Sequence, residues 1–450
     1  MYLINEIHAT QLDNDELLII NLINGAADFI HVDIYNKLLN SDYANIDAEI
    51  LNKLLDRRYL FKSEHDFLVF QSKIDGLIQE SELHTAPNFL IVPTYACNLN
   101  CIYCYEQTYE IDHKKSIDIQ YVLDEQFKFI KNTFVALKAS NKQLVSKDVL
   151  ITLMGGEPLL AQNKEHIQLI MSKIRQDNYS FNIVTNGVDL HHYLDDLVSY
   201  EVKDIQVTLD GSKDIHDKRR LFRFGQGSFD VILTNIGKAL DKKIKVNIRV
   251  NVDKGNIHNL PELATTLLSA FGHNDLLHPY IYLLQDGGCS GDTNVLSEKV
   301  GIEEILSLEE KFPQIKLFYK KFHPSAFINS IFSDEMFQPS LRHCGASSNQ
   351  YILDYKGNIY KCWHGIGNSN YAVASLLDKS KTNSNLINQW ENRNTKAIEK
   401  CSTCKYRYIC GTGCPAAGHK EREHFDMEKP YCIEYKKLID TLIPYYLKES

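Results

Sequence analysis

The sequence predicts an α/β protein built around an open, partial (β/α)6 barrel of the TIM-like kind. Three observations lead to this class. Strand and helix patterns alternate between about residues 88 and 285, six such units follow one another, and unusual glycine- and cysteine-containing segments fall just after the strands. Such alternation indicates a parallel sheet covered by helices. Six units are too few for a complete eightfold barrel, so we expect an open one.

Each element of this barrel has its own local signal. Strands are expected where short apolar runs end in turn residues, and helices where apolar residues recur every three or four positions. The strand candidates are 89–94, 149–154, 180–185, 204–209, 244–250 and 279–284, and the helix candidates are 119–137, 164–176, 190–199, 228–241 and 259–270. The last helix is expected to begin with Asn259 as its cap and Pro261 in its first turn. In such sheets, function collects in the loops that follow the strands.

Residues 1–85 are expected to form a separate small module. Residues 16–23 and 27–32 are predicted strands, joined by the hairpin turn Asn24-Gly25. Asp33 is the predicted cap of a helix that runs to about Leu39. A second helix is expected at about 47–56, and a further strand at 59–61. A module of this kind either caps the barrel or binds a partner, and the sequence leaves both readings open.

Composition excludes several classes of protein. The 450 residues include 49 Lys and Arg against 58 Asp and Glu, giving a net charge of −9 without a long basic block, so we expect no nucleic-acid partner. The first residues do not resemble a signal peptide, and no apolar run reaches about twenty residues, so no membrane span is expected. Eleven cysteines, several in tight pairs, then indicate metal ligands in a cytoplasmic protein.

The segment after the first strand carries the strongest chemical signal. Cys97, Cys101 and Cys104 have the spacing C-x3-C-x2-C. Three thiolates leave one iron of a 4Fe–4S cube open for another ligand. The alternatives are a zinc loop that lacks its fourth ligand, or three cysteines of the core.

This spacing, with the segments that close the next strands, resembles the radical S-adenosylmethionine (SAM) enzymes. Gly155-Gly-Glu-Pro158 follows the second strand, Thr185-Asn-Gly187 the third, and Thr208-Leu-Asp-Gly211 the fourth. The resemblance implies that the open iron chelates SAM and that the second segment contacts the SAM amino group. Glycines let the backbone approach a ligand, and Glu157 can accept hydrogen bonds from an ammonium group. The expected SAM-binding residues are Gly155, Gly156, Glu157, Pro158, Asn186, Thr208 and Arg220.

The stretch from Thr208 to Arg220 is similar to one in the formylglycine-forming sulfatase maturases of this family. There a hydroxyl at the Thr208 position and a nearby arginine hold the SAM ribose and carboxylate, a task that suits the two parallel bonds of a guanidinium. Arg220 is the expected arginine, with Arg219 and Arg223 as close rivals and a solvated surface charge as the alternative for each. Whether Arg249 points into the barrel is left open.

The last hundred residues resemble the seven-cysteine SPASM extension of radical SAM peptide and protein modifiers. The seven are Cys344, Cys362, Cys401, Cys404, Cys410, Cys414 and Cys432. The resemblance implies one complete auxiliary 4Fe–4S cluster on Cys401, Cys404, Cys410 and Cys432, and a second on Cys344, Cys362 and Cys414. A zinc ribbon is the alternative for the C-x2-C pair.

The second auxiliary cluster departs from the sulfatase-maturase pattern. That pattern supplies an extra cysteine just before the first of the seven, and residues 337–343 contain none. The cluster therefore has an open site, or takes Cys289 or His343 as a further ligand. An open iron could bind a substrate thiolate. Cys289 itself is read as a free or incidental thiol.

These observations predict four regions and one leading function. The regions are an N-terminal module (1–85), the radical SAM partial barrel (86–285), a connecting region (286–340) and a SPASM domain (341–450). The leading hypothesis is a maturase that oxidatively cross-links a ribosomally made precursor peptide, forming a thioether or carbon–carbon bond with SAM and three 4Fe–4S clusters. The alternatives are a formylglycine-forming sulfatase maturase and a non-enzymatic iron–sulfur electron carrier.

The expected partners follow from the same hypothesis. They are a precursor peptide with its leader and an electron donor such as flavodoxin or ferredoxin. The element order of residues 1–85 loosely resembles the winged-helix leader-recognition modules of peptide-modifying enzymes, which bind peptide as an added strand. No catalytic base can be named from the sequence.

Overall fold

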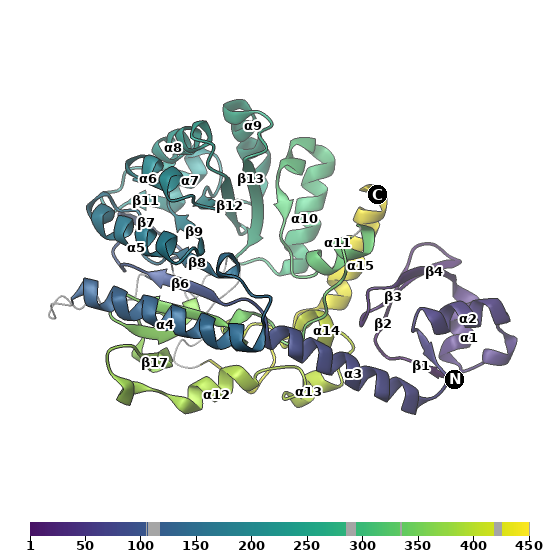
Figure 1. Cartoon of the computed structure of the whole chain (residues 1–450). Coiled ribbons are helices and arrows are strands. Elements are labelled where there is room, and N and C mark those ends of the chain that lie inside the picture. The colour runs from purple at the N-terminus through teal and green to yellow at the C-terminus, as the bar shows by residue number, and fades with distance from the viewer. Residues whose placement is uncertain (105, 107–117, 285–293, 334, 418–424, 450) are drawn as a thin grey trace.

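The computed structural model describes residues 1–104, 106, 118–284, 294–333, 335–417 and 425–449. A ten-stranded sheet forms its centre (Figure 1). Six neighbouring strands of this sheet run parallel, and all six lie at the predicted positions: β6 (Asn88–Val92), β8 (Leu150–Leu153), β9 (Ser180–Thr185), β10 (Ile205–Thr208), β12 (Val246–Val252) and β13 (Leu277–Leu283). The prediction of an open α/β sheet that resembles a partial barrel is therefore confirmed.

Helices connect these strands and cover the outer face of the sheet. They are α4 (Ile119–Ser140), α5 (Lys164–Gln176), α6 (Leu194–Ser199), α7 (Lys213–Arg219), α8 (Phe229–Asp241) and α9 (Leu260–Phe271). Apolar residues at helical spacing, such as Ile167, Ile170 and Ile174 of α5, pack into one core with the alternate strand residues. The predicted helix 190–199 is divided into a 3₁₀ turn, Leu190–His192, and α6.

The predicted cap Asn259 holds the cap position of α9, but its side chain makes no capping bond. Its amide oxygen instead accepts from the backbone N–H of Ser212, and its nitrogen donates to the Ser212 hydroxyl and to Glu262. The side chain therefore ties the start of α9 to the loop after β10, and the predictions of Asn259 as the N-cap residue and of Pro261 in the first turn are confirmed.

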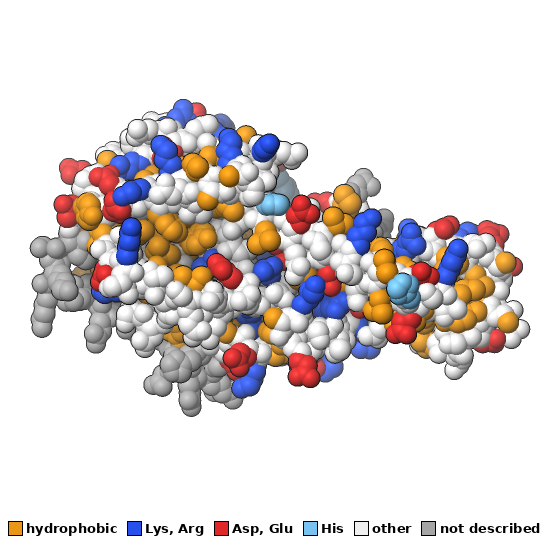
Figure 2. All heavy atoms as spheres, turned by 60° about the horizontal axis from the view of Figure 1, so that its bottom comes forward, with side chains coloured by type: hydrophobic (Ala, Val, Ile, Leu, Met, Phe, Trp, Pro, Cys, Tyr) orange, Lys and Arg blue, Asp and Glu red, His pale blue; other side chains and the backbone are white. Residues whose placement is uncertain are grey.

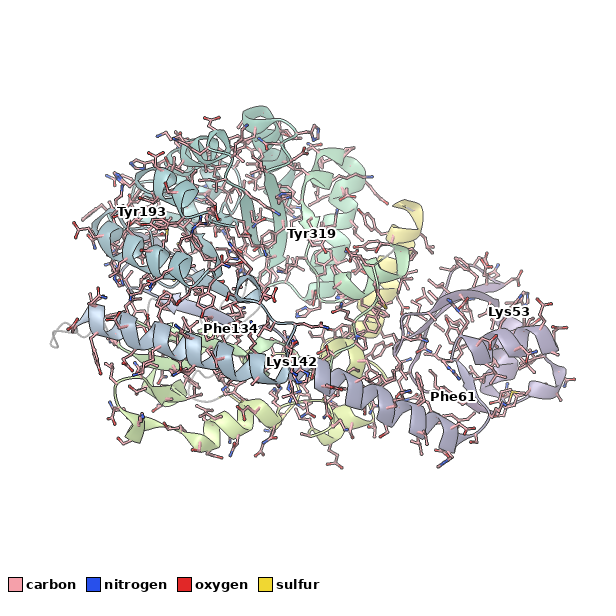
Figure 3. The ribbon with its side chains drawn as sticks, in the orientation of Figure 1. Lys53, Phe61, Phe134, Lys142, Tyr193 and Tyr319 are labelled. Carbon is pink, nitrogen blue, oxygen red and sulfur yellow. The ribbon has the colours of Figure 1, made fainter. Side chains whose placement is uncertain are left out.

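The sheet extends beyond the six predicted strands at both edges. β14 (Tyr319–Lys320) lies parallel to β13, and Figure 3 marks Tyr319 on this edge. At the other edge β15 (Gln350–Asp354) lies parallel to β6 and is followed by β16 (Asn358–Tyr360) and β17 (Ala374–Ser375). The C-terminal, cysteine-rich part of the chain is thus continuous with the barrel sheet.

The N-terminal module contains a three-stranded antiparallel sheet in the order β2 (Ile7–Gln11), β3 (Glu16–Asn21) and β4 (Ala27–His31). Two helices follow, α1 (Val32–Leu39) and α2 (Ala48–Asp56), and β5 (Leu60–Phe61) pairs with β1 (Tyr2–Leu3). The predicted hairpin turns at Gly25, whose φ is +75°. Asp33 does not cap α1, because the His31 side chain accepts the bond from the Asp33 N–H instead.

Helices outside the predicted set include α3 (Glu64–Leu83), α10 (Glu298–Lys311) and α11 (Ser325–Phe332). α3 joins the N-terminal module to the barrel (Figure 1). α10 and α11 occupy the region expected to be a plain connection, and both pack against the C-terminal helix α15 (Tyr435–Glu449). None of the described helices is long and apolar enough to cross a membrane.

The N-terminal module is docked on the C-terminal part of the chain. His8 of β2 bonds Tyr406 through Nδ1 at 3.1 Å and Asp440 of α15 through Nε2 at 3.0 Å. The Tyr408 hydroxyl donates to Asp75 of α3 at 2.8 Å. The two ends of the chain therefore share one buried polar interface.

Candidate active site

The three-cysteine loop leaves the carboxyl end of β6 and is held by a second loop. Residues Leu99–Cys101 form the short strand β7, which pairs antiparallel with β11 (Arg220–Phe222). Cys101 lies opposite Arg220 in this pairing. The arginine expected from the sequence is thereby placed against the cysteine loop, although 118 residues of chain lie between the two positions.

The three thiols lie within electrostatic reach of one another and of a buried cation. Burial, with the Glu157 carboxylate, raises the pKa of Cys97 to about 12, and the other two thiols add to the shift. Burial also raises the pKa of Cys101, whereas Arg220 lowers it. Thiols buried in this way need a cationic partner before they lose their protons. Iron ions would supply that partner, so the donor set fits the open corner of a cluster.

Nearby N–H groups are aimed at the sulfur of Cys97. The backbone N–H of Leu99 and the amide of Asn186 donate to its Sγ, at 3.4 and 3.7 Å. Asn186 also donates to Asn98 at 2.7 Å. In the described residues no three His, Cys, Asp or Glu side chains lie close enough to hold a single metal ion.

The Gly-Gly-Glu-Pro segment lies against the backbone that leads into the cysteine loop. A Cβ on Gly156 would lie 2.3 Å from the Ala96 carbonyl oxygen, and one on Gly155 would lie 2.4 Å from Val92. Gly155 also has a φ of +96°. Both glycines are thus required by close approach to the chain itself. Pro158 follows as a buried residue.

The Glu157 carboxylate is buried and accepts three bonds from the chain. Its donors are the Leu159 N–H at 2.8 Å, the Thr185 hydroxyl at 2.7 Å and the Asn186 N–H at 2.6 Å. Burial raises the pKa of Glu157 to about 7, against these bonds, which lower it. Glu157 therefore fixes the ends of β8 and β9 relative to each other, and the expected contact with an ammonium group stays a prediction.

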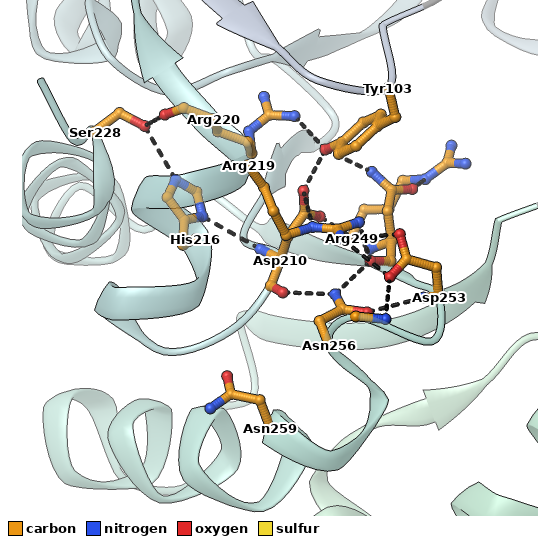
Figure 4. A network of polar contacts seen from close by, with 12 residues as sticks. Tyr103, Asp210, His216, Arg219, Arg220, Ser228, Arg249, Asp253, Asn256 and Asn259 are labelled. Carbon is orange, nitrogen blue, oxygen red and sulfur yellow. Dashed lines mark hydrogen bonds and ion pairs between the residues drawn. The ribbon is translucent and has the colours of Figure 1, made fainter. Parts of the chain in front are cut away.

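The fourth strand contributes a polar network that Figure 4 shows. Tyr103 stands between Cys101 and Cys104 in the sequence. Its hydroxyl donates to Asp210 and accepts from Arg220 Nη1 at 2.7 Å. Arg219 Nη1 donates to both carboxylate oxygens of Asp253, at 2.8 and 3.0 Å. Thr208 is buried at the end of β10, in register with Arg249.

The three rival arginines have different surroundings. Arg219 is committed to Asp253, and the exposed Arg223 donates to the Cys97 carbonyl at 2.9 Å. Arg220 is buried, and its Nε has no hydrogen-bond partner among the described residues. Arg220 therefore keeps a donor for a ligand at this site. Tyr103, Asp210 and Asp253 were not predicted, although the position of Tyr103 inside the cysteine spacing was a usable signal.

The seven C-terminal cysteines come together as two sets. Burial raises the pKa of Cys362, and the neighbouring Cys344 and Cys414 raise it further. Burial likewise raises the pKa of Cys410 to about 12, with Cys401, Cys404 and Cys432 adding to the shift. The assignment of these two sets to two clusters stays a prediction.

Arg393 lies between the two sets and was not predicted. Its guanidinium is buried and donates to the carbonyls of Met427 at 2.6 Å and Lys429 at 2.9 Å. Desolvation lowers the pKa of Arg393, while Cys401, Cys414 and Cys344 act on it in the opposite direction. His343 donates from Nδ1 to the Cys410 carbonyl at 3.3 Å. Cys289 lies outside the described residues.

Comparison with known proteins defines the class. Residues 91–267 match the family model of the Radical SAM superfamily, and this part of the chain is a radical SAM domain. The protein is accordingly an enzyme of the radical SAM type, so it is not the electron carrier considered above. Such a domain implies a 4Fe–4S cluster and SAM as cofactors.

Its relatives include maturases. A cysteine-type anaerobic sulfatase-maturating enzyme of Clostridium novyi is 23% identical over 377 residues, which cover 79% of this chain and 95% of the relative. Among solved structures, anSMEcpe with bound AdoMet has a TM-score of 0.57 at 18% identity, covering 81% of this chain and 95% of its own. Streptococcus suis SuiB bound to precursor peptide SuiA has a TM-score of 0.54 at 13% identity, covering 95% and 99%.

Proposed function

We propose that this enzyme is a radical SAM maturase that oxidatively cross-links a ribosomally made precursor peptide, forming a thioether or carbon–carbon bond. The observation that carries the proposal is the combination of one three-cysteine site with two further cysteine sets in a C-terminal part that joins the barrel sheet through β15. The Streptococcus suis neighbour, whose structure includes a precursor peptide, supports a peptide substrate.

The cofactors and the chain would divide the work. When bound, the cluster and SAM supply a 5′-deoxyadenosyl radical that removes a hydrogen atom from a substrate carbon. Cys97, Cys101 and Cys104 would hold the cluster. Arg220 would bind the SAM carboxylate through its unused Nε–H donor. Thr208, at the end of β10, and Asn186, whose amide donates to Cys97, would be further SAM contacts. Glu157 and the two glycines keep these loops in place.

We assign the C-terminal cysteines to two auxiliary 4Fe–4S clusters in a SPASM domain. Cys401, Cys404, Cys410 and Cys432 would hold one, and Cys344, Cys362 and Cys414 the other. The product has lost two hydrogen atoms, so the second electron must leave the substrate, and these clusters are the proposed acceptors. The open corner of the second cluster remains available for a substrate thiolate.

Residues 1–85 are proposed to recognise the leader by strand addition. The β2 edge of the module faces α15 and Tyr406, whereas no described strand pairs with the outer edge of β4. A free edge can accept a peptide strand. The share of the chain that anSMEcpe leaves uncovered is close in size to this module, and SuiB covers nearly the whole chain. Figure 2 shows hydrophobic side chains among charged ones on this module.

The strand-addition proposal is tested with a charge on the free edge. Phe29 of β4 has 57% of its surface exposed, and Val135 of α4 has 58%. We expect Phe29→Asp to weaken binding of the leader of a candidate precursor, while Val135→Asp leaves it unchanged. Equal leader binding by the two variants would contradict a role for β4.

The reaction is tested by anaerobic incubation with SAM, dithionite and the same precursor. We expect methionine, 5′-deoxyadenosine and a peptide that has lost two hydrogen atoms with every heavier atom retained. A peptide in which a cysteine or serine has become formylglycine would instead establish the sulfatase-maturase alternative, which the Clostridium novyi relative favours.

A further inference from the structure

Cations and tyrosine rings alternate on the inner face of the sheet, at its β12–β13–β14 end. Arg249 of β12 lies in register with Tyr280 of β13, and its guanidinium carbon lies 4.0 Å from the ring centroid of Tyr282. Lys321, directly after β14, places its Nζ 5.6 Å from the Tyr280 ring. Two positive charges therefore flank the same pair of rings.

These side chains face the interior of the partial barrel. On β12 and β13 the alternate residues Ile248, Val250 and Ile281 are buried in the core beneath the helices. Arg249 and Tyr280 project from the opposite face. The Tyr280 hydroxyl reaches Gln206 of β10 at 2.7 Å, across the intervening strand.

Neither cation has a carboxylate partner among the described residues. Ion pairs that include Arg249 or Lys321 are absent there, and three carboxylates of this part of the chain have partners of their own: Asp253 pairs with Arg219, Glu309 with Lys320, and Glu298 with His323. Burial lowers the pKa of Lys321, and the charge of Arg249 lowers it further. Two like charges held together in this way favour an anion between them.

The pair lies between the radical site and the C-terminal cysteines. Arg249 donates from Nε to Asn251 at 2.7 Å, and Asn251 donates to the Tyr103 hydroxyl at 3.2 Å, which lies in the cysteine loop (Figure 4). In the other direction, burial raises the pKa of Tyr282, and among the charges that act on it is Cys414. A substrate reaching from one site to the other passes over these residues.

We propose that Arg249 and Lys321 bind a carboxylate of the substrate, with Tyr280 and Tyr282 as the surface on which that residue lies. The inference rests on the proposed peptide-maturase function and names its substrate chemistry: a peptide with an acidic side chain, or a free C-terminal carboxylate, near the modified position. A guanidinium matches a carboxylate with two parallel bonds, and the lysine adds a third donor. The SAM carboxylate has its own arginine in Arg220, beside the cysteines.

The test uses the cluster-loaded, SAM-bound enzyme and three blocked tripeptides, with binding followed by ligand-observed NMR. The probes are acetyl-Ala-Glu-Ala-amide, acetyl-Ala-Gln-Ala-amide, and acetyl-Ala-Ala-Ala with a free carboxylate. We expect a carboxylate probe to bind in the millimolar range and the glutamine probe about tenfold more weakly. Preference for the glutamate probe assigns the site to an acidic side chain, and preference for the free carboxylate assigns it to the C-terminus.

Variants connect the binding to the two cations. Arg249→Gln and Lys321→Gln should each weaken the carboxylate probe about tenfold without changing the glutamine probe. Arg249→Lys keeps the positive charge but loses the two parallel donors of the guanidinium, so its affinity for the carboxylate probe should lie between those of the unaltered enzyme and Arg249→Gln. Lys238→Gln on the exposed side of α8 is the control and should bind like the unaltered enzyme. Iron content and circular dichroism show that each variant is folded and loaded.

Three outcomes would overturn the inference: equal binding of the glutamate and glutamine probes, unchanged binding by Arg249→Gln and Lys321→Gln, or no binding of either carboxylate probe. SAM cleavage by the unaltered enzyme, measured in parallel with dithionite, tests the proposed function separately. Cleavage without carboxylate binding would refute only the site. Absence of SAM cleavage would refute the proposed function, while the binding result would still decide whether the two cations bind a carboxylate.

Discussion

At the scale of single residues, the SAM-site loops are held by close packing of backbone against backbone. Gly156 has no room for a side chain, since an added Cβ would meet the Ala96 carbonyl oxygen. This carbonyl cannot move without moving Cys97, the next residue. The glycines of this segment therefore determine the position of the first cysteine.

We expect Gly156→Ala to lower the iron content of the three-cysteine site and to abolish SAM cleavage. Gly76→Ala is the matched control, because Gly76 lies in α3 with nothing within 4 Å of an added Cβ. An alanine there should be neutral or stabilise the helix by about 1 kcal/mol. Full iron content and normal cleavage in Gly156→Ala would show that the loop adjusts.

Glu157 makes a pH-dependent contribution to stability. Burial raises its pKa to about 7 from an ordinary 4.5, so the folded protein binds this proton more tightly than the unfolded chain. The free energy of unfolding should therefore fall as the pH rises from about 4.5 through about 7, by at most about 3 kcal/mol.

Glu157→Gln removes this titration. Across that pH window the variant should gain stability relative to the unaltered protein, as followed by anaerobic thermal unfolding. The exposed Glu303→Gln on α10 serves as the control. A constant difference between Glu157→Gln and the unaltered protein would mean that Glu157 stays ionised in the fold.

At the scale of elements, loops distant in sequence are joined by short contacts. The strands β7 and β11 are three residues each, yet they bring Arg220 to Cys101. In the C-terminal part, Arg393 at the end of α12 (Ser384–Asn392) plays a comparable role. It holds the carbonyls of residues 426, 427 and 429, which lead into Cys432.

Arg393→Gln should release the segment at residues 426–429, and the cysteine set that includes Cys432 should then lose its cluster. The expected result is a loss of about 4 iron atoms per chain, with the radical SAM cluster retained. Arg57→Gln, at an ion pair with Asp28 in the N-terminal module, should leave the iron content unchanged. An unchanged iron content in Arg393→Gln would show that the guanidinium is not needed to hold this segment for cluster binding.

Elements with strong local patterns could be predicted from the sequence, and those made by distant pairing could not. The six barrel strands carry apolar, β-branched runs followed by turn residues, and all were located. β7 and β11 are too short to have a pattern, and β15 has no local sign that it joins β6. α3 was missed because it has apolar residues on both faces, with Phe67 buried and Leu68 and Val69 exposed.

The same distinction applies to the candidate site. Cysteines and glycines have spacings that a sequence displays, so a sequence can indicate which cysteines belong together. Arg393, Asp253 and Lys321 carry no motif, and their importance follows only from what surrounds them. The bonds by which Glu157 joins the ends of two strands likewise follow only from the fold.

At the scale of the whole molecule, the two ends of the chain are coupled. Asp440 of α15 accepts from His8, Thr10 and Lys436, and these bonds hold its pKa below the ordinary value against the effect of burial. His8 is fully buried at this contact. A leader bound to the N-terminal module would therefore be linked through these contacts to the C-terminal helix α15.

We expect Asp440→Ala to loosen the docking of the N-terminal module, because two buried donors of β2 lose their acceptor. Limited proteolysis between α3 and β6 should accelerate severalfold, while SAM cleavage without peptide is retained. Asp195→Ala, at an exposed pair with Lys242, is the control. Unchanged proteolysis in Asp440→Ala would show that other contacts suffice.

The central claim, three 4Fe–4S clusters of which one is the radical SAM site, is tested most directly by counting metal. Iron, sulfide and zinc would be measured in anaerobically purified protein and in a triple Cys97, Cys101 and Cys104→Ala variant. We predict about 12 iron atoms per chain, falling to about 8 in the variant. About 8 falling to about 4 would leave one auxiliary site without a cluster, and zinc in place of iron would contradict the account.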